Sequence, residues 1–206
     1  MNQNLFIAFE GIDGSGKSTQ AEMLAAWMES TGRKVWRTAE PTKRPVGKMI
    51  RDIFSGKQIA DQKVIAGLFV ADRLDHLLNE DDGMLLKLKN DFCVITDRYY
   101  LSSYAYHSVH MDMDWVIQAN AMSARLLRPD VHIFIDVPPE VSMQRIQSSR
   151  SETEMYENLE NLKKVRETYL LAIKKVGQTE NILRFDGTMA PDQLAKQIQE
   201  AIKKLG

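Results

Sequence analysis

The sequence has a single cysteine, Cys93, among 206 residues. One cysteine excludes an intrachain disulfide framework and a zinc site built from several cysteines. Because Cys93 lies within the apolar run from Phe92 to Ile95, we expect a buried and inert thiol. No apolar stretch approaches the length of a membrane span, and the first residues lack the basic start of a signal peptide. We therefore expect a soluble, cytoplasmic protein that does not bind membranes.

An excess of charge of either sign is also absent. The chain has 27 lysines and arginines against 28 aspartates and glutamates, which gives a net charge of −1. Proteins that coat nucleic acids or anionic membranes need a large basic surplus, so the balance argues against both partners. It does not exclude a small anionic ligand that a few local cations hold. Apolar residues make up 44% and charged residues 27%, values that are typical of one globular domain over residues 1–206.

Short apolar runs alternate with longer helical patterns along the chain. The runs predict strands and the patterns predict helices. The predicted strands lie near residues 5–9, 35–36, 94–95, 133–135 and 182–185, and the predicted helices cover about 17–30, 61–79, 113–127, 153–176 and 191–205. This alternation predicts an α/β fold of three layers, a mostly parallel five-stranded sheet with helices on both faces.

The strongest motif is a complete G-x-x-x-x-G-K-S between the first predicted strand and the first predicted helix. It consists of Gly11, Ile12, Asp13, Gly14, Ser15, Gly16, Lys17 and Ser18, and Thr19 follows it. Its glycines allow successive backbone N–H groups to surround phosphate oxygens at a helix N-terminus. We expect Lys17 to project toward solvent and reach the phosphates, and Ser18 to ligate Mg²⁺. The motif predicts a P-loop NTPase-type fold that binds a nucleotide, although a chance glycine loop is the alternative.

Asp97 and Arg98 come directly after the predicted strand near residues 94–95. Ligands of parallel α/β sheets bind at the carboxyl ends of the strands. We therefore expect Asp97 to face the metal beside Ser18, through water, and Arg98 to direct its guanidinium at a phosphate. An isolated Asp-Arg pair is more often a surface ion pair, but a P-loop sheet favours the functional role.

Further motifs make the pattern more specific than the P-loop alone. They are Glu40-Pro41-Thr42, Phe69-Val70-Ala71-Asp72-Arg73, Asp97-Arg98-Tyr99-Tyr100-Leu101-Ser102-Ser103 and Arg128-Pro129-Asp130. Together with residues 11–20, they resemble the thymidylate kinase family in order and spacing over nearly the whole chain. The resemblance implies a kinase that transfers the γ-phosphoryl of ATP to dTMP, uses Mg²⁺ and forms a homodimer.

The resemblance also implies which residues bind the base and sugar of the acceptor. Phe69 corresponds to the aromatic residue that stacks on thymine, and Arg73 to the arginine that donates to an exocyclic oxygen of the base. The two lie four residues apart and share a helix face. Ser103 corresponds to a polar residue beside the base, and Tyr106 to the ring that crowds the 2′ position. Core packing is the alternative role for Phe69.

The residues at the phosphates follow from the same resemblance. Asp13 corresponds to the P-loop carboxylate that positions the acceptor sugar, and Arg98 and Arg51 to arginines that contact the monophosphate. Gly14-Ser15 stands where one branch of the family has a catalytic arginine. The other branch supplies it from a lid, which here covers about residues 147–157 and contains Arg150. We expect Lys17, Arg98, Asp13 and Arg150 to be catalytic.

Several questions stay open from the sequence. His107 follows Ala105-Tyr106 where the family often has glutamine, so its role is undefined. Lys43 or Arg44 could contact the substrate. Five apolar residues could form the dimer face or belong to the core of the monomer: Met23, Trp27, Met49, Val64 and Leu68. A kinase for another nucleoside monophosphate or a deoxynucleoside is the nearest alternative function. A nucleotide switch is another, but the chain lacks the guanine-reading Asn-Lys-x-Asp.

Overall fold

The computed structural model describes residues 4–149 and 158–205. Five strands form one sheet: β1 (Phe6–Glu10), β2 (Lys34–Ala39), β3 (Phe92–Asp97), β4 (Val131–Asp136) and β5 (Ile182–Asp186). Their order is β2-β3-β1-β4-β5, and every neighbouring pair is parallel. The predicted five-stranded parallel sheet is confirmed.

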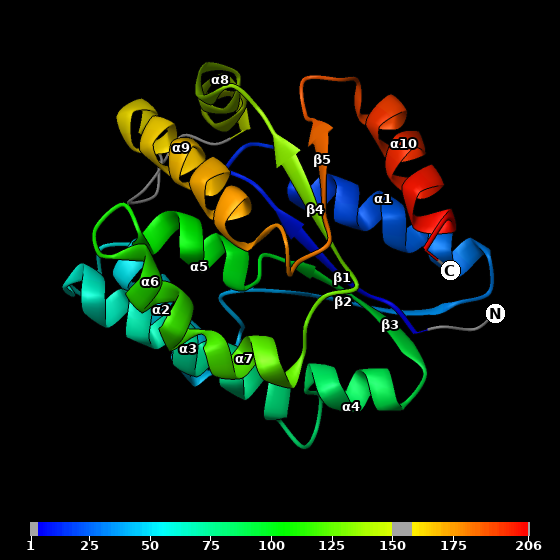
Figure 1. The fold of residues 1–206 in the computed structure, drawn as a ribbon, viewed down its shortest axis with the longest axis horizontal. Coiled ribbons are helices and arrows are strands. Elements are labelled where there is room, and N and C mark those ends of the chain that lie inside the picture. The colour runs from blue at the N-terminus through cyan, green and yellow to red at the C-terminus, as the bar shows by residue number, and fades with distance from the viewer. Residues whose placement is uncertain (1–3, 150–157, 206) are drawn as a thin grey trace.

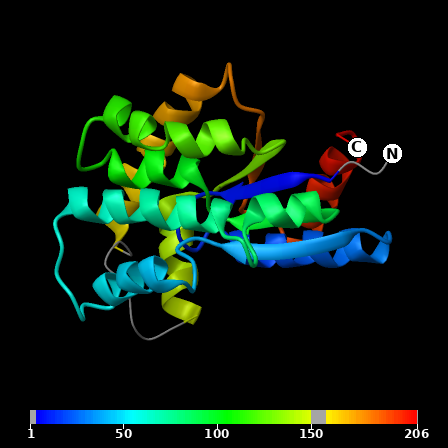
Figure 2. The same ribbon diagram turned by 90° about the horizontal axis from the view of Figure 1, so that it is seen from below.

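Helices cover both faces of this sheet, as Figures 1 and 2 show. They are α1 (Lys17–Ser30), α2 (Pro45–Phe54), α3 (Gln62–Leu78), α4 (Met84–Lys89), α5 (Tyr100–His107), α6 (Met113–Ala119), α7 (Ala121–Leu126), α8 (Pro139–Ser149), α9 (Leu159–Val176) and α10 (Pro191–Lys203). In the part of the chain that the structure describes, no helix combines the length and the apolar character that crossing a membrane requires.

The core has two halves, one on each face of the sheet. On one face, α1 and α10 pack against the side chains of β1, β3 and β4 that point toward them, among them Ile7, Phe9 and Ile133. On the other face, α5 and α9 cover Phe6, Ala8 and Phe134. Strands buried on both sides are expected to be apolar runs, and β1 and β4 are fully buried. The three predicted layers are therefore present.

Two predicted helices have different bounds in the structure. The helix expected over residues 113–127 is interrupted at Asn120, between α6 and α7. The amide of Asn120 lies in the interior, where its oxygen accepts from Arg73 and its nitrogen donates to the Val116 carbonyl at 2.9 Å. The helix expected from residue 153 is described from Leu159, because Asn158 caps it by accepting from the Asn161 N–H at 2.9 Å.

Candidate active site

The P-loop connects the end of β1 to the start of α1 and requires glycine at two tight positions. Gly11 and Gly14 have φ angles of 144° and 72°. A Cβ on Gly11 would lie 2.5 Å from the Ile135 carbonyl oxygen, and one on Gly14 would lie 2.7 Å from that of Ser142. Gly16 precedes α1 and offers no side chain to its first N–H groups. These N–H groups are thus available to an anion, as a phosphate-binding loop requires.

Lys17 is the first residue of α1 and is buried, with 5% of its surface exposed. The expectation of a solvent-facing lysine is wrong, because its Nζ turns back and donates to the Ile12 carbonyl at 2.9 Å. Burial, together with repulsion from Arg98, lowers the pKa of Lys17 to about 8. The ammonium is therefore held over the P-loop in an environment that favours an incoming anion.

Ser18 and Asp97 meet as expected, at the carboxyl ends of β1 and β3. The Ser18 hydroxyl donates to Oδ2 of Asp97. The second oxygen, Oδ1, is buried and has no hydrogen-bond partner among the described residues. A hydroxyl and an orphaned carboxylate oxygen beside a phosphate loop fit Mg²⁺, which binds through one or two carboxylates and completes its shell with water and phosphates. Residues 4–149 and 158–205 contain no cluster of three or more acidic, histidine or cysteine side chains that could hold a metal ion.

Arg98 is held in a strained conformation between the P-loop and α5. Its φ is 74°, a left-handed value that is uncommon outside glycine and typical of functional positions. The guanidinium donates to the Asp13 carboxylate, to the Tyr106 hydroxyl at 2.9 Å and to the Ser102 hydroxyl at 3.1 Å. Burial alone would raise the pKa of Asp13, but Arg98 and Lys17 hold it below its ordinary value. The pair is therefore charged at neutral pH.

A cavity of about 800 Å³ opens beside this pair. It is lined by all seven residues expected at the acceptor: Asp13, Arg51, Phe69, Arg73, Arg98, Ser103 and Tyr106. Sequence reasoning missed the contributions of Glu40, Lys48, Asp52 and Phe54 to the same lining. Three of these lie on or close to α2, a helix that the apolar pattern did not reveal. The sequence contains one indication of this helix. Proline is common at the first position of a helix, and Pro45 occupies that position in α2.

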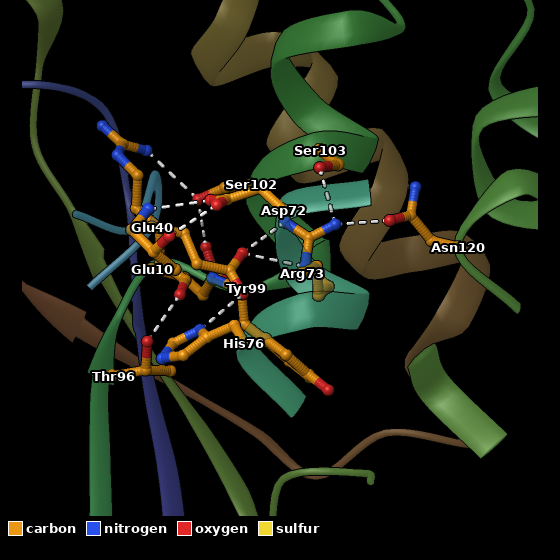
Figure 3. Close-up of polar contacts among 12 residues, drawn as sticks. Glu10, Glu40, Asp72, Arg73, His76, Thr96, Tyr99, Ser102, Ser103 and Asn120 are labelled. Carbon is orange, nitrogen blue, oxygen red and sulfur yellow. Dashed lines mark hydrogen bonds and ion pairs between the residues drawn. The ribbon is translucent and has the colours of Figure 1, made fainter. Parts of the chain in front are cut away.

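Arg73 is completely buried at one end of the cavity. Its Nε donates to Glu40 at 2.8 Å, its Nη2 lies 2.6 Å from the same carboxylate, and its Nη1 donates to Ser103 at 3.0 Å and to Asn120. Figure 3 shows the guanidinium between Glu40 on one side and Ser103 and Asn120 on the other. Burial alone would lower the pKa of Arg73, but Glu40 outweighs it and the pKa is raised. Arg73 is thus a fixed, permanently charged donor.

The carboxylate of Glu40 is itself held by His76, on the side away from Arg73. Nδ1 of His76 lies 3.2 Å from its carboxylate, and Nε2 of His76 lies 2.7 Å from the Thr38 hydroxyl. Glu40 directly follows β2, and Thr38 lies within that strand. The orientation of Arg73 therefore depends on a chain of polar contacts that leads back to the sheet.

Phe69, on α3, lies among aromatic side chains in the same cavity. Its ring centroid is 6.0 Å from that of Phe54 and 5.2 Å from that of His107. In the loop after Glu40, neither Lys43 nor Arg44 lines the cavity. Arg44 instead forms ion pairs with Asp75 and Asp82.

Arg150 and most of the expected lid, residues 150–157, lie outside the described residues. Arg145 is described, and it contacts the P-loop from α8. Its Nη1 is 3.5 Å from the carbonyl oxygens of Gly14 and Ser15, and its Nη2 donates to Gly187 at 2.9 Å.

The parallel sheet, the phosphate loop and the adjoining cavity define a P-loop nucleotide-binding protein with room for a second ligand. The model of the thymidylate kinase family matches residues 9–198. The chain is 40% identical over 176 residues to a probable thymidylate kinase of Thermococcus kodakarensis (81% of this chain, 82% of the relative). It is 34% identical over 201 residues to one of Pyrobaculum aerophilum, with 97% of each chain covered. The chain belongs to the thymidylate kinase family, and the resemblance seen in its motifs is confirmed.

Proposed function

We propose that the protein transfers the γ-phosphoryl group of ATP to dTMP, which yields ADP and dTDP. The observation that supports this most directly is the cavity, because it joins the P-loop to a binding site for a nucleoside monophosphate. Arg98 and Asp13 lie at the P-loop end, and Phe69 and Arg73 provide an aromatic surface and a fixed donor for a base. Family membership supports dTMP as the acceptor. We place the reaction in the cytoplasm, where ATP is available.

In this reaction an oxygen of the acceptor phosphate attacks the γ-phosphorus while the bond to the β–γ bridging oxygen breaks and ADP departs. Such transfers depend on positioning and charge neutralisation rather than on covalent steps by the protein. The ammonium of Lys17 neutralises the phosphates of ATP, and Arg98 and Arg51 hold the acceptor phosphate. Ser18 and Asp97 would hold Mg²⁺, which would supply further positive charge at the ATP phosphates. The proposed lid arginine, Arg150, adds charge during transfer, and Arg145 supports the P-loop.

At the other end of the cavity, Phe69 stacks on thymine and Arg73 donates to a carbonyl oxygen of the base. Ser103 holds Arg73 at 3.0 Å and lies beside the base. The Tyr106 hydroxyl donates to Asp13 at 2.8 Å, so its ring is fixed near the sugar. We assign the preference for deoxyribose to this ring, which would crowd a 2′-hydroxyl.

A screen of acceptors tests the proposed function. ADP formation is measured with dTMP, dUMP, dCMP, dAMP and thymidine at constant ATP and Mg²⁺. We expect the highest kcat/KM with dTMP. A higher value for another acceptor would establish the alternative kinase, and ATP hydrolysis that no acceptor accelerates would establish the nucleotide switch.

Replacing Phe69 by alanine is expected to weaken dTMP binding by roughly 1–3 kcal/mol, the range found for stacking of a base on an aromatic ring. ATP affinity should change little, because Phe69 belongs to the acceptor cavity and not to the P-loop. Titration calorimetry with each nucleotide measures both effects. A lower melting temperature together with an equal loss of both affinities would show that Phe69 acts in core packing.

We also propose a homodimer that forms through α2 and α3. Val64, Gly67, Ala71 and Leu78 are exposed along one side of α3, at a spacing that places them on one face. Met49 is exposed on α2, which packs beside α3. The small residues in the stripe allow a second helix to approach closely. Trp27 instead packs against the core.

The variant Ala71→Glu tests this interface, because it places a charge in the middle of the stripe. We expect the molar mass in light scattering to fall from that of a dimer to that of a monomer. Leu171→Glu, at a residue of α9 with 60% exposure, is the matched control and should leave the mass unchanged. A wild-type protein that is already monomeric would contradict the proposal.

A further inference from the structure

Asp72 is a buried carboxylate of α3 that the proposed mechanism does not use. It is 0% exposed and does not line the acceptor cavity. Among the described residues it forms no ion pair, and both hydrogen bonds that it accepts come from Thr42. Thr42 donates its backbone N–H to Oδ2 at 2.8 Å and its hydroxyl to Oδ1. Because burying a carboxylate is costly unless its oxygens are hydrogen-bonded, the stability of Asp72 in this place depends on Thr42.

Thr42 lies in the loop after β2, between α2 and α3. It is 6% exposed, and its hydroxyl oxygen also accepts from the Arg44 N–H at 3.2 Å. On the side of α2, Gly47 packs directly against its backbone, since a Cβ on Gly47 would overlap the carbonyl oxygen of Thr42. On the side of α3, Asp72 holds its N–H and its hydroxyl. The Thr42 carbonyl therefore has a fixed position between the two helices.

Arg51 depends on this carbonyl for its orientation. It lies one helical turn after Gly47 on α2 and lines the acceptor cavity. Its Nη1 donates to the Pro41 carbonyl at 3.1 Å and to the Thr42 carbonyl. These two carbonyls are its only hydrogen-bond partners among the described residues, and no described carboxylate pairs with it. The direction of its guanidinium is therefore set by the loop that Asp72 holds.

We propose that Asp72 is a positioning residue for the acceptor phosphate, because it holds Thr42 and thereby directs Arg51 into the cavity. This assignment rests on the proposed function, in which Arg51 holds the phosphate of dTMP. Asp72 touches neither the cavity nor the guanidinium, so it acts only through the loop. The chain of contacts runs from α3 through the loop to α2, and each step is a hydrogen bond.

The base end of the cavity is held by different contacts. Arg73 follows Asp72 in α3, but its partners are Glu40, Ser103 and Asn120. Loss of the Asp72 carboxylate should therefore disturb the phosphate end and spare the base end. Thymidine, which has the base and sugar of dTMP but no phosphate, distinguishes the two ends.

Steady-state kinetics of Asp72→Ala test the assignment, with dTMP as the substrate and thymidine as a competitive inhibitor. The KM for dTMP should rise about tenfold, as expected when one hydrogen bond to a charged group is lost. The Ki of thymidine and the KM for ATP should not change. Asp72→Asn should restore the KM for dTMP to within a few-fold of wild type, because its amide oxygen can accept from the Thr42 N–H while its amide nitrogen donates to the Thr42 hydroxyl.

The double variant Asp72→Ala with Arg51→Met tests whether Asp72 acts through Arg51. Arg51→Met alone should raise the KM for dTMP, and adding Asp72→Ala should raise it no further, since the guanidinium that Asp72 positions is already absent. Losses that multiply would overturn the assignment. Ser123→Ala is the matched control, because Ser123 is a buried polar residue of α7, beside α3, whose hydroxyl has no hydrogen-bond partner among the described residues. It should leave all three constants unchanged.

An unchanged KM for dTMP in Asp72→Ala, or an equal loss for dTMP and thymidine, would show that Asp72 does not position a phosphate contact. A loss in Asp72→Asn as large as that in Asp72→Ala would also overturn the assignment. If Asp72→Ala does not fold, Thr42→Val decides, because it keeps the branched shape and removes the hydroxyl that donates to Asp72. A higher KM for dTMP with an unchanged Ki of thymidine then supports the assignment, and any other result overturns it. Failure of the wild-type protein to phosphorylate dTMP would instead refute the proposed function.

Discussion

Lys17→Met is expected to lower kcat for phosphoryl transfer by about 10²–10³ or more, the loss found when one preorganised charge donor is removed from a transition state. Methionine keeps the unbranched stem of a residue that is only 5% exposed, so the fold should remain intact. The KM for dTMP should stay nearly unchanged, because Lys17 does not line the acceptor cavity. Circular dichroism and a melting curve provide the folding control. Retention of most of the wild-type kcat would contradict the role of Lys17.

The lowered pKa of Lys17, about 8, gives the same residue a pH signature. Above this pH the ammonium loses its proton in the free protein, whereas bound phosphates favour the charged form. ATP binding should therefore take up a proton between about pH 8 and the ordinary pKa of lysine near 10.5, and ATP affinity should fall as the pH rises through this window. Calorimetry in buffers of different ionisation enthalpy measures the uptake. Lys17→Met should show no such uptake at pH 9.

The parts of the site that the sequence predicted best are those that local geometry determines. The P-loop is a contiguous motif. The turn between β1 and α1 determines the positions of its glycines and of Lys17 and Ser18. Asp97 was placed correctly beside Ser18 because strand ends of a parallel sheet share one edge, although 79 residues separate the two. A few rules of topology were sufficient to place Asp97 beside Ser18, but they did not predict that Lys17 is buried.

The base end of the cavity depends on contacts that no local pattern encodes. Arg73 is held by Glu40, Ser103 and Asn120, which come from three other segments of the chain. The inward-facing amide of Asn120 also explains why the helix predicted over residues 113–127 is divided into α6 and α7. Helix α5 was missed because all of its residues are buried, so it lacks the alternation of apolar and polar faces that reveals a helix.

Glu40→Ala is expected to lower the free energy of unfolding by about 3–5 kcal/mol, the cost of leaving a buried charge without its partner. The side chains of Arg73 and Glu40 are 0% and 1% exposed, so solvent does not screen the guanidinium once the carboxylate is removed. This is a large part of the roughly 5–15 kcal/mol by which a native protein is stable. Urea unfolding measures the loss. Glu160→Ala, which breaks a surface pair with Lys164, is the control and should have little effect.

The double variant Glu40→Leu with Arg73→Met separates the structural role of this pair from its role in binding. Removing both charges leaves no buried ion, so the double variant should be more stable than Glu40→Ala. Recovery should be incomplete, because Nδ1 of His76 loses its contact with Glu40 and the amide oxygen of Asn120 loses its donor, Arg73 (Figure 3). Binding of dTMP should be weak in the double variant, since no guanidinium is left to donate to the base, while ATP binding should stay at the wild-type value. A double variant less stable than Glu40→Ala would show that the polar network, and not the unpaired charge, determines stability here.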